Sequence, residues 1–125
     1  MGWEIGASGF QSVLGAEVPT AIKRYLGHDL GEFLATHDVT IDEVGAWVCH
    51  PGGPKVIEAV ENALDLPADA LDRTRESLRE NGNLSSVSVL DVLAATMADR
   101  PPPGSIGLMI AMGPGFSAEL VLLSW

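Results

Sequence analysis

The sequence predicts an α/β fold, in which helices cover a layered, mixed β-sheet. Two observations carry this prediction. First, apolar segments of strand length occur at residues 44–49, 106–112 and 118–124. Second, the residues between these segments follow helical patterns, so the order is strand, strand, helices, strand, helices, strand, strand. Such an order is typical neither of an all-helical nor of an all-β protein.

The first third of the chain predicts a hairpin followed by a helix. Residues 1–5 and 10–15 are two strand-like segments that flank the turn sequence at residues 6–9. A helical pattern then covers residues 21–36, with Pro19 placed where a helix can begin. We expect this helix to break near Gly27 or Gly31, because glycine is unfavourable inside helices.

The middle of the chain predicts a buried strand and three helices. Residues 40–43 form a short helical or turn segment before the apolar, uncharged strand at 44–49. A helix begins near Pro54, with one apolar stripe formed by Val56, Ile57, Val60, Ala63 and Leu64. Two further helices are expected at 71–80 and 84–98, the first ended by Asn81-Gly82.

The helix at residues 84–98 has few polar positions, so we expect it to be buried on most sides. Asp91 lies within it, and a buried carboxylate requires a partner. The strands at 106–112 and 118–124 are apolar on both faces and are joined by Gly113-Pro114-Gly115. A sheet of this kind needs cover on both sides, which hints at a missing layer.

Composition narrows the classes of function. The chain has 125 residues, 46% of them hydrophobic, which suits one domain with a core. Its 7 basic and 17 acidic residues give a net charge of −10, which argues against nucleic-acid binding and against docking on an anionic membrane. One cysteine excludes an internal disulfide and gives no zinc-type spacing, so no metal site is expected. No signal peptide or membrane span is evident, and we expect a cytoplasmic protein.

The sequence Trp47-Val48-Cys49-His50-Pro51-Gly52-Gly53 places the only cysteine beside a histidine. Adjacent residues of a strand point to opposite faces, so Cys49 and His50 are poorly placed to act together as nucleophile and base. The simple interpretation of Cys49 is a small buried apolar residue. A Cys–His hydrolase that uses Cys49 is the alternative. His50 lies between a buried strand and a helix N-terminus, where α/β proteins bind ligands, although a structural histidine is equally compatible with this place.

Three stretches carry a family resemblance. They are WVCHPGGPKV at 47–56, RENGNLSSVSVL at 79–90 and AMGPGFSAELVLLSW at 111–125. In this order and spacing they resemble the C-terminal part of type III polyketide synthases, the chalcone and stilbene synthase family of thiolase-like condensing enzymes. Ketoacyl synthases of the third type carry a similar His and Asn without HPGGP. The resemblance covers residues 1–125 as one C-terminal domain and implies a thiolase-like half, with the bacterial branch as the nearer match.

The resemblance implies a Cys–His–Asn triad, in which His50 and Asn83 match the catalytic histidine and asparagine. The nucleophilic cysteine belongs to the N-terminal half of the family's enzymes, and no segment of this chain matches it. His50 is therefore expected to serve a cysteine outside this chain. The alternative for Asn83 is a turn residue after Gly82 whose side chain caps the helix at Leu84.

The resemblance also implies contacts with coenzyme A and with the growing product. Gly52, Gly53 and Lys55 open a helix and match the coenzyme A tunnel, whereas a solvated lysine is the alternative for Lys55. Gly113, Pro114 and Gly115 resemble the family's GFGPG loop, with Ala111 and Met112 as departures. Their alternative is a plain turn. Ser12 matches a large aromatic gatekeeper of the plant enzymes, and Ser12 and Ser85 leave room for a bulkier or longer acyl chain.

The implied function is an acyltransferase that condenses an acyl-CoA starter with malonyl-CoA. The resemblance implies no cofactor, since coenzyme A thioesters are the substrates. The implied assembly is a homo-oligomer, a dimer in the family, or a pairing with a separate N-terminal half. A non-catalytic isolated half and an enzyme like the third type of ketoacyl synthase are the alternatives. Since the nucleophile is missing, we expect the 125-residue chain alone to be inactive.

Overall fold

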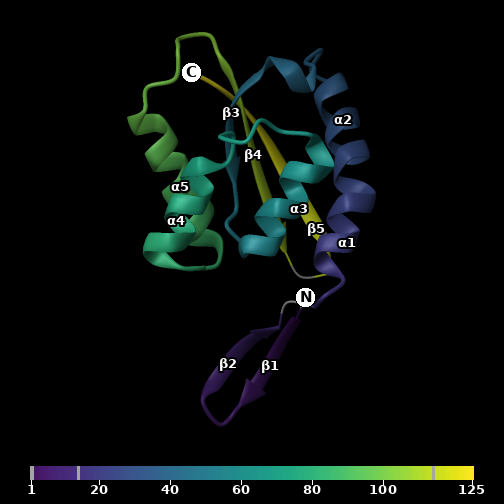
Figure 1. The fold of residues 1–125 in the computed structure, drawn as a ribbon, viewed down its shortest axis with the longest axis vertical. Helices are drawn as coiled ribbons and strands as arrows, with labels where there is room; N and C mark the ends of the chain where they lie inside the picture. The colour runs from purple at the N-terminus through teal and green to yellow at the C-terminus, as the bar shows by residue number, and fades with distance from the viewer. Residues whose placement is uncertain (1, 14, 114) are drawn as a thin grey trace.

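The computed structural model describes residues 2–13, 15–113 and 115–125, with Ser12 described by its backbone only (Figure 1). Expectations that fall on Met1, Leu14 and Pro114 lie outside the described residues. The main sheet contains β3 (Val44–Cys49), β4 (Ile106–Gly113) and β5 (Ser117–Ser124) in the order β3-β4-β5. β3 is parallel to β4, and β4 is antiparallel to β5. The predicted mixed sheet is therefore confirmed.

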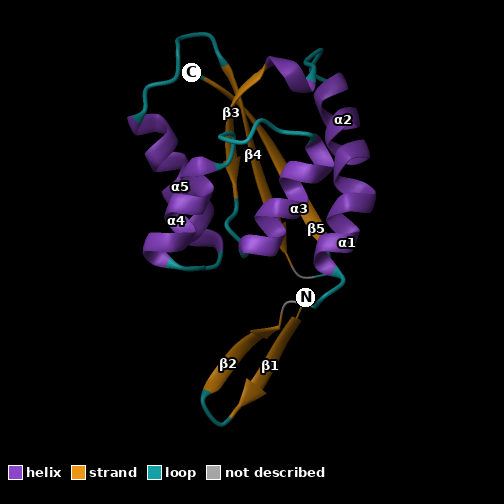
Figure 2. Ribbon diagram, viewed as in Figure 1, coloured by secondary structure: helices purple, strands orange, loops and turns teal. Residues whose placement is uncertain are grey.

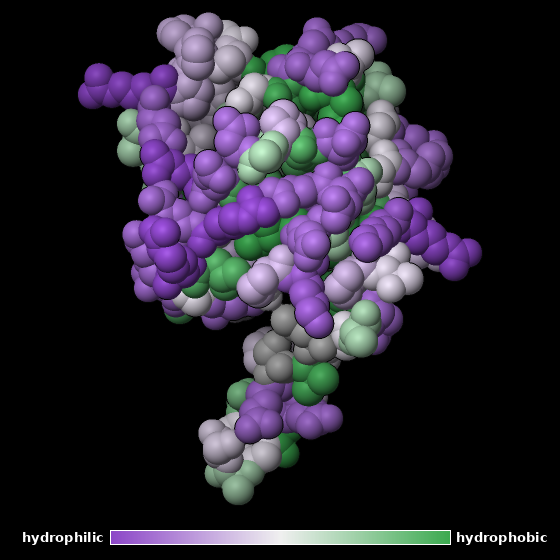
Figure 3. Space-filling model, viewed as in Figure 1, coloured by the Kyte–Doolittle hydropathy of each residue, from purple (hydrophilic) through white to green (hydrophobic). Residues whose placement is uncertain are grey.

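The predicted N-terminal hairpin is also confirmed. β1 (Gly2–Gly6) and β2 (Gly9–Val13) pair antiparallel as a separate two-stranded sheet that projects from the main body (Figures 1 and 2). Trp3, Ile5 and Phe10 are exposed on it. Hydrophilic side chains cover most of the face of the main body seen in Figure 3, whereas hydrophobic ones show on the hairpin. The hairpin thus presents apolar surface outside the core.

The long N-terminal helical segment runs without the expected break. α1 (Val18–Ala21) continues through a π-helical turn at Ile22–Leu26 into α2 (Gly27–Ala35). Gly27 keeps helical angles, with φ −61° and ψ −41°. A Cβ atom at this position would lie 3.2 Å from the carbonyl oxygen of Ala63. The expectation of a break near Gly27 or Gly31 was wrong, because at Gly27 the missing side chain allows two helices to approach closely.

One face of the sheet carries the larger core. α3 (Pro54–Leu64) begins at the predicted proline and buries Val56, Ile57, Val60 and Leu64. It packs with the α1–α2 segment, and Trp47 and Cys49 of β3 belong to the same cluster. A 3₁₀ turn at Ile41–Glu43 leads into β3, where the sequence predicted a short helical or turn segment. Figure 2 shows these helices lying together on one side of the strands.

α4 (Asp72–Asn81) and α5 (Ser86–Ala98) complete the fold. α5 contacts β3 and β4, and its Val89 and Val92 form a second core cluster with Val48. It begins two residues later than predicted, because Leu84 and Ser85 form the loop before it.

The prediction that α5 is buried on most sides is wrong for the described chain. One face of α5 packs on the sheet, whereas Val87 and Leu90 on the other face are more than half exposed. Among the described residues, no element covers that face of the helix closely enough to bury these two side chains. The strands show the same lack of cover, since Val121 of β5 is also exposed.

Candidate active site

His50 emerges where β3 ends. Its backbone N–H donates a hydrogen bond of 2.8 Å to the carbonyl oxygen of Ile110 in β4, which continues the parallel pairing by one residue. The side chain is partly buried, and this burial lowers the pKa of His50 below its ordinary value. The imidazole is therefore neutral at neutral pH, with one ring nitrogen as a donor and the other as an acceptor.

Cys49 is confirmed as a buried residue. It has no exposed surface, and its thiol donates to the backbone carbonyl oxygen of His50 at 3.7 Å. Burial, with a smaller effect from the charge of Glu61, raises the pKa of Cys49 to about 12. A protonated, inaccessible thiol cannot act as a nucleophile. The Cys–His hydrolase hypothesis therefore loses its reactive group.

Asn83 lies in the loop between α4 and α5, and both ends of its carboxamide are engaged. Its Oδ1 accepts a 2.9 Å hydrogen bond from the backbone N–H of Ser85, and its Nδ2 donates to the carbonyl oxygen of Gly52 at 3.4 Å. The backbone N–H of Leu84 instead donates to Ser88 Oγ at 2.7 Å. The expected cap by Asn83 at Leu84 is wrong, because α5 begins at Ser86 and no described side chain makes its N-terminal cap hydrogen bond. Asn83 combines a turn interaction with N–H groups directed toward the loop after His50.

His50 and Asn83 line one cavity of about 650 Å³. Three other residues predicted for the site, Gly52, Ser85 and Gly113, line it as well. Most of the remaining lining is apolar and comes from the hairpin, α1, α3, α5 and β4: Trp3, Phe10, Val18, Val56, Val89, Ala111 and Met112. The cavity therefore pairs two hydrogen-bonding side chains with apolar walls, which is the usual make-up of a small-molecule site.

Other predicted site residues lie outside this lining. Gly53, Lys55 and Gly115 do not border the cavity, and Lys55 is exposed in the first turn of α3. The side chain of Ser12 and the whole of Pro114 fall outside the described residues. Gly115 has φ +76°, a conformation that favours glycine, which agrees with its alternative as a turn residue.

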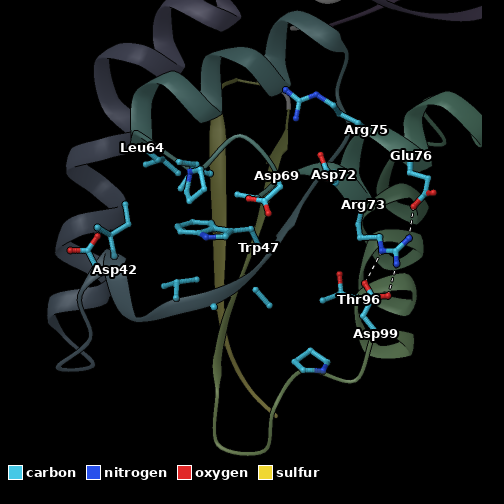
Figure 4. Close-up of a pocket in the computed structure, with 18 of the residues that line it drawn as sticks. Asp42, Trp47, Leu64, Asp69, Asp72, Arg73, Arg75, Glu76, Thr96 and Asp99 are labelled. Atoms are coloured by element: carbon cyan, nitrogen blue, oxygen red, sulfur yellow. Dashed lines mark hydrogen bonds and ion pairs between the residues drawn. The ribbon is translucent and has the colours of Figure 1, made fainter.

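A larger cavity of about 1160 Å³ lies along the free edge of β3, beside Trp47 (Figure 4). Arg73 projects into it and forms ion pairs with Glu76 and Asp99. Arg75, which also borders it, pairs with Glu61. Among the described residues, the lining holds four arginines, two of which are Arg79 and Arg100, but it also holds six carboxylates. The carboxylates outnumber the guanidinium groups, so the cavity is poorly suited to an anionic ligand. We therefore place the candidate site in the smaller cavity, where His50 and Asn83 meet.

Two buried polar side chains beside the site escaped the sequence analysis. Thr74 in α4 is fully buried and donates from Oγ1 to the carbonyl oxygen of Cys49 at 3.0 Å. Ser88 in α5 is 1% exposed and accepts from Leu84. Thr74 does not stand out in a strongly polar helix, and Ser88 is one of three serines at positions 85, 86 and 88. Only the packing of the helices shows that both hydroxyl groups hold backbone next to His50 or Asn83.

The described ranges offer neither a metal site nor a membrane span. Within residues 2–13, 15–113 and 115–125, no group of three or more His, Cys, Asp or Glu side chains is arranged to hold a metal ion. In the same ranges no helix has the length and apolar character needed to cross a membrane.

The comparisons with known proteins agree on one family. The family model for chalcone and stilbene synthases, C-terminal domain, matches residues 3–124. The chain is 56% identical to 1,3,6,8-tetrahydroxynaphthalene synthase of Streptomyces peucetius subsp. caesius, over 100% of this chain and 33% of that protein. It is 33% identical to a putative chalcone synthase of Bacillus subtilis (strain 168), over 100% of this chain and 34% of that protein.

Solved structures show the same similarity. 1,3,6,8-Tetrahydroxynaphthalene synthase of Streptomyces coelicolor A3(2), a bacterial type III polyketide synthase, matches with a TM-score of 0.88 at 29% identity, over 98% of this chain and 35% of that one. PKS-I from the brown alga Ectocarpus siliculosus matches with a TM-score of 0.89 at 29% identity, over 98% and 34%. The chain spans about a third of the length of these relatives. It belongs to the chalcone and stilbene synthase family of type III polyketide synthases and has the fold of their thiolase-like C-terminal half.

Proposed function

We propose that this chain supplies the histidine and the asparagine of a condensing site in which an acyl-CoA starter reacts with malonyl-CoA. The observation that carries the proposal is the meeting of His50 and Asn83 at one largely apolar cavity of about 650 Å³. Family membership and the similarity to tetrahydroxynaphthalene synthase support the reaction class. The nucleophilic cysteine comes from a segment outside this chain, since Cys49 is fully buried.

The reaction needs hydrogen-bond donors at one oxygen. Malonyl-CoA loses its carboxylate as carbon dioxide, and the electron pair of the broken C–C bond passes into an enolate whose charge rests on the thioester oxygen. N–H groups of His50 and Asn83 stabilise that oxygen. The enolate carbon then attacks the acyl group carried on the cysteine, and the thiolate leaves. Burial lowers the pKa of His50, and its neutral imidazole still carries one N–H that can donate to the thioester oxygen.

The substrates enter as coenzyme A thioesters, and no resident cofactor takes part. Gly52, which borders the cavity, and Gly53 and Lys55 beside it, are proposed to guide the coenzyme A moiety. Lys55 is exposed at the start of α3, where a lysine can meet a phosphate that approaches from solvent. Since the relative with 56% identity is named for an aromatic product, we infer an aromatic polyketide product here as well.

The 125 residues alone are proposed to be inactive and to act only together with the other two thirds of a type III polyketide synthase. The observation in favour is the exposed apolar surface on α5 and on the hairpin, including Leu90, Ile5 and Phe10. Apolar patches of this kind mark interaction surfaces. In the complete assembly a homodimer is expected.

The test uses a chimera in which the N-terminal two thirds of the Streptomyces peucetius enzyme precede this chain. Release of labelled carbon dioxide from malonyl-CoA and formation of polyketide are measured with a panel of acyl-CoA starters. His50→Ala and Asn83→Ala are each expected to lower kcat by about 10²–10³-fold, the usual cost of losing one such donor. His28→Ala is the matched control, because His28 is exposed on α2 and contacts Glu32.

Unchanged activity in His50→Ala or Asn83→Ala would contradict the assigned roles. An active 125-residue chain without the N-terminal segment would contradict the need for an external cysteine. A chimera that folds and stays inert with every starter would favour a non-catalytic half. Each of these results is read against the folded state of the same sample, measured by circular dichroism.

A further inference from the structure

The peptide unit that carries His50 is hydrogen-bonded on both of its sides. Its N–H, on His50, donates to the carbonyl oxygen of Ile110 at 2.8 Å. Its carbonyl, on Cys49, accepts from Thr74 Oγ1 at 3.0 Å. A trans peptide points its N–H and its C=O in opposite directions, so one bond reaches β4 and the other reaches α4. The peptide plane between Cys49 and His50 is therefore held by β4 on one side and by α4 on the other, and this fixes the backbone to which the His50 side chain is attached.

The loop after His50 is held from the same helix. α4 ends at Asn81, and Asn83 follows two residues later. The Asn83 carboxamide donates to the carbonyl oxygen of Gly52 at 3.4 Å. His50 thus lies between two backbone carbonyls, those of Cys49 and Gly52, and both accept from α4 or from the loop that directly follows it.

α4 is itself fixed on α5. Ser77 Oγ donates to Asp91 Oδ2 at 2.6 Å, and Asn81 Nδ2 donates to the same oxygen at 3.0 Å. Near its first turn, Arg73 pairs with Asp99 at the end of α5. A helix held at both ends moves as one body, so any displacement of α4 would move the support of His50 and the Asn83 loop together.

We propose that α4 sets the position of His50 relative to Asn83, with Thr74 as the positioning residue. This inference rests on the proposed function of the same two side chains. Thr74 is not one of the residues that line the cavity, and its hydroxyl is bonded to the Cys49 carbonyl. Since β3 is an edge strand of the described sheet, that carbonyl has no neighbouring strand to bind, and the threonine hydroxyl takes the place of one.

The test compares four versions of the chimera described above, namely the unchanged chimera and three variants of it. Thr74→Val keeps the shape and removes the hydroxyl, and Thr74→Ser restores the hydroxyl. Thr96→Val is the matched control, because Thr96 is also buried and its hydroxyl donates to the carbonyl oxygen of Val92, one turn earlier in α5. Values of kcat and KM for malonyl-CoA decarboxylation and the melting temperature are measured for each version.

Thr74→Val is expected to lower kcat about 10- to 100-fold, because misplacing a catalytic group by about 1 Å costs rates of this order. KM should stay within about twofold, and Thr74→Ser should recover most of kcat. Thr96→Val should lower the melting temperature by a similar amount while keeping kcat. If kcat falls no further in Thr74→Val than in Thr96→Val, the inference is wrong.

His50→Ala is measured in parallel and separates the two proposals. A large loss in His50→Ala with none in Thr74→Val would overturn only the positioning role of Thr74. No loss in His50→Ala would overturn the proposed function itself. Should Thr74→Val not fold, Thr74→Ala is compared with Thr74→Ser in its place, and equal kcat values in that pair would equally refute the inference.

Discussion

Asp91 has the clearest energetic role that the structure assigns to a single polar side chain. It is half-buried on α5, where it accepts hydrogen bonds from Ser77 and Asn81 of α4. Ser77 is 5% exposed, so Asp91→Ala would leave its hydroxyl buried without this acceptor. A hydrogen bond to a charged group contributes about 1.5–3 kcal/mol, and the exposed bond from Asn81 adds little. We therefore expect Asp91→Ala to lower the free energy of unfolding by about 2 kcal/mol.

A double-mutant cycle isolates this contact. Asp91→Ala, Ser77→Ala and the double variant are unfolded in urea, and the free energy of unfolding is extrapolated to water. The two changes should be strongly non-additive, with a coupling of about 1–2 kcal/mol, because both remove the same bond. Glu80→Ala is the control, since Glu80 is exposed on α4 and its change should cost less than about 0.5 kcal/mol.

Two results would refute this reasoning. One is a loss below about 0.5 kcal/mol in Asp91→Ala, which would mean that water replaces the carboxylate at Ser77 without cost. The other is additivity of the two single changes within about 0.5 kcal/mol, which would mean that the side chains contribute independently. A changed m-value would point instead to an altered denatured state.

Two further predictions concern pH and backbone conformation. Because burial lowers the pKa of His50, the unfolded chain binds the proton first as the pH falls through 6.5, and the folded state loses stability there. His50→Asn should therefore gain stability relative to the parent chain below pH 6.5, by at most about 1.4 kcal/mol per pH unit, and parallel pH curves in urea titrations would contradict this. Gly82 has φ +71°, whereas Gly31 lies inside α2, where an added Cβ atom would meet no neighbouring group within 4 Å. Gly82→Ala should therefore destabilise by about 1–3 kcal/mol and Gly31→Ala should stabilise by about 0.5–1 kcal/mol. Equal melting temperatures for these two variants would show that backbone conformation does not decide the effect.

Local patterns predicted most of the fold. The stripe on α3 and the apolar strands are properties of short sequence windows, and the structure has each of them in place. The errors concern features that depend on distant contacts. Gly27 does not interrupt its helix. Its missing side chain instead leaves room for the backbone carbonyl of Ala63, which packs close to it. The start of α5 is displaced because Ser85 takes φ +59°, next to bonds made by Asn83 and Ser88.

The sequence also predicted some residues of the candidate site and missed others. His50 follows a buried strand and precedes a helix, so its place could be reasoned from the chain, whereas Asn83 stood out through the family resemblance and not through its spacing. Thr74 could not be found, since it lies 25 residues from Cys49 in a strongly polar helix. Gly52 and Lys55 are three residues apart, yet only Gly52 borders the cavity. The helix α3 begins between these two residues and turns the chain. Two residues that are close in sequence therefore do not both border the cavity.

The uncovered face of α5 and the candidate site share one helix. One face of this helix packs on the sheet through Val89 and Val92, while Val87 and Leu90 are left exposed on the other. Val87 lies only four residues after Asn83, and Ser86 beside it lines the cavity. A protein surface that covers Val87 and Leu90 therefore contacts the same helix that lines the cavity through Ser86 and Val89. Val87 and Leu90 are 56% and 57% exposed, so covering them would contribute roughly half of the 1.5–3 kcal/mol for full burial of such a side chain. Under the proposed function, the segment that supplies the cysteine is the one expected to cover them.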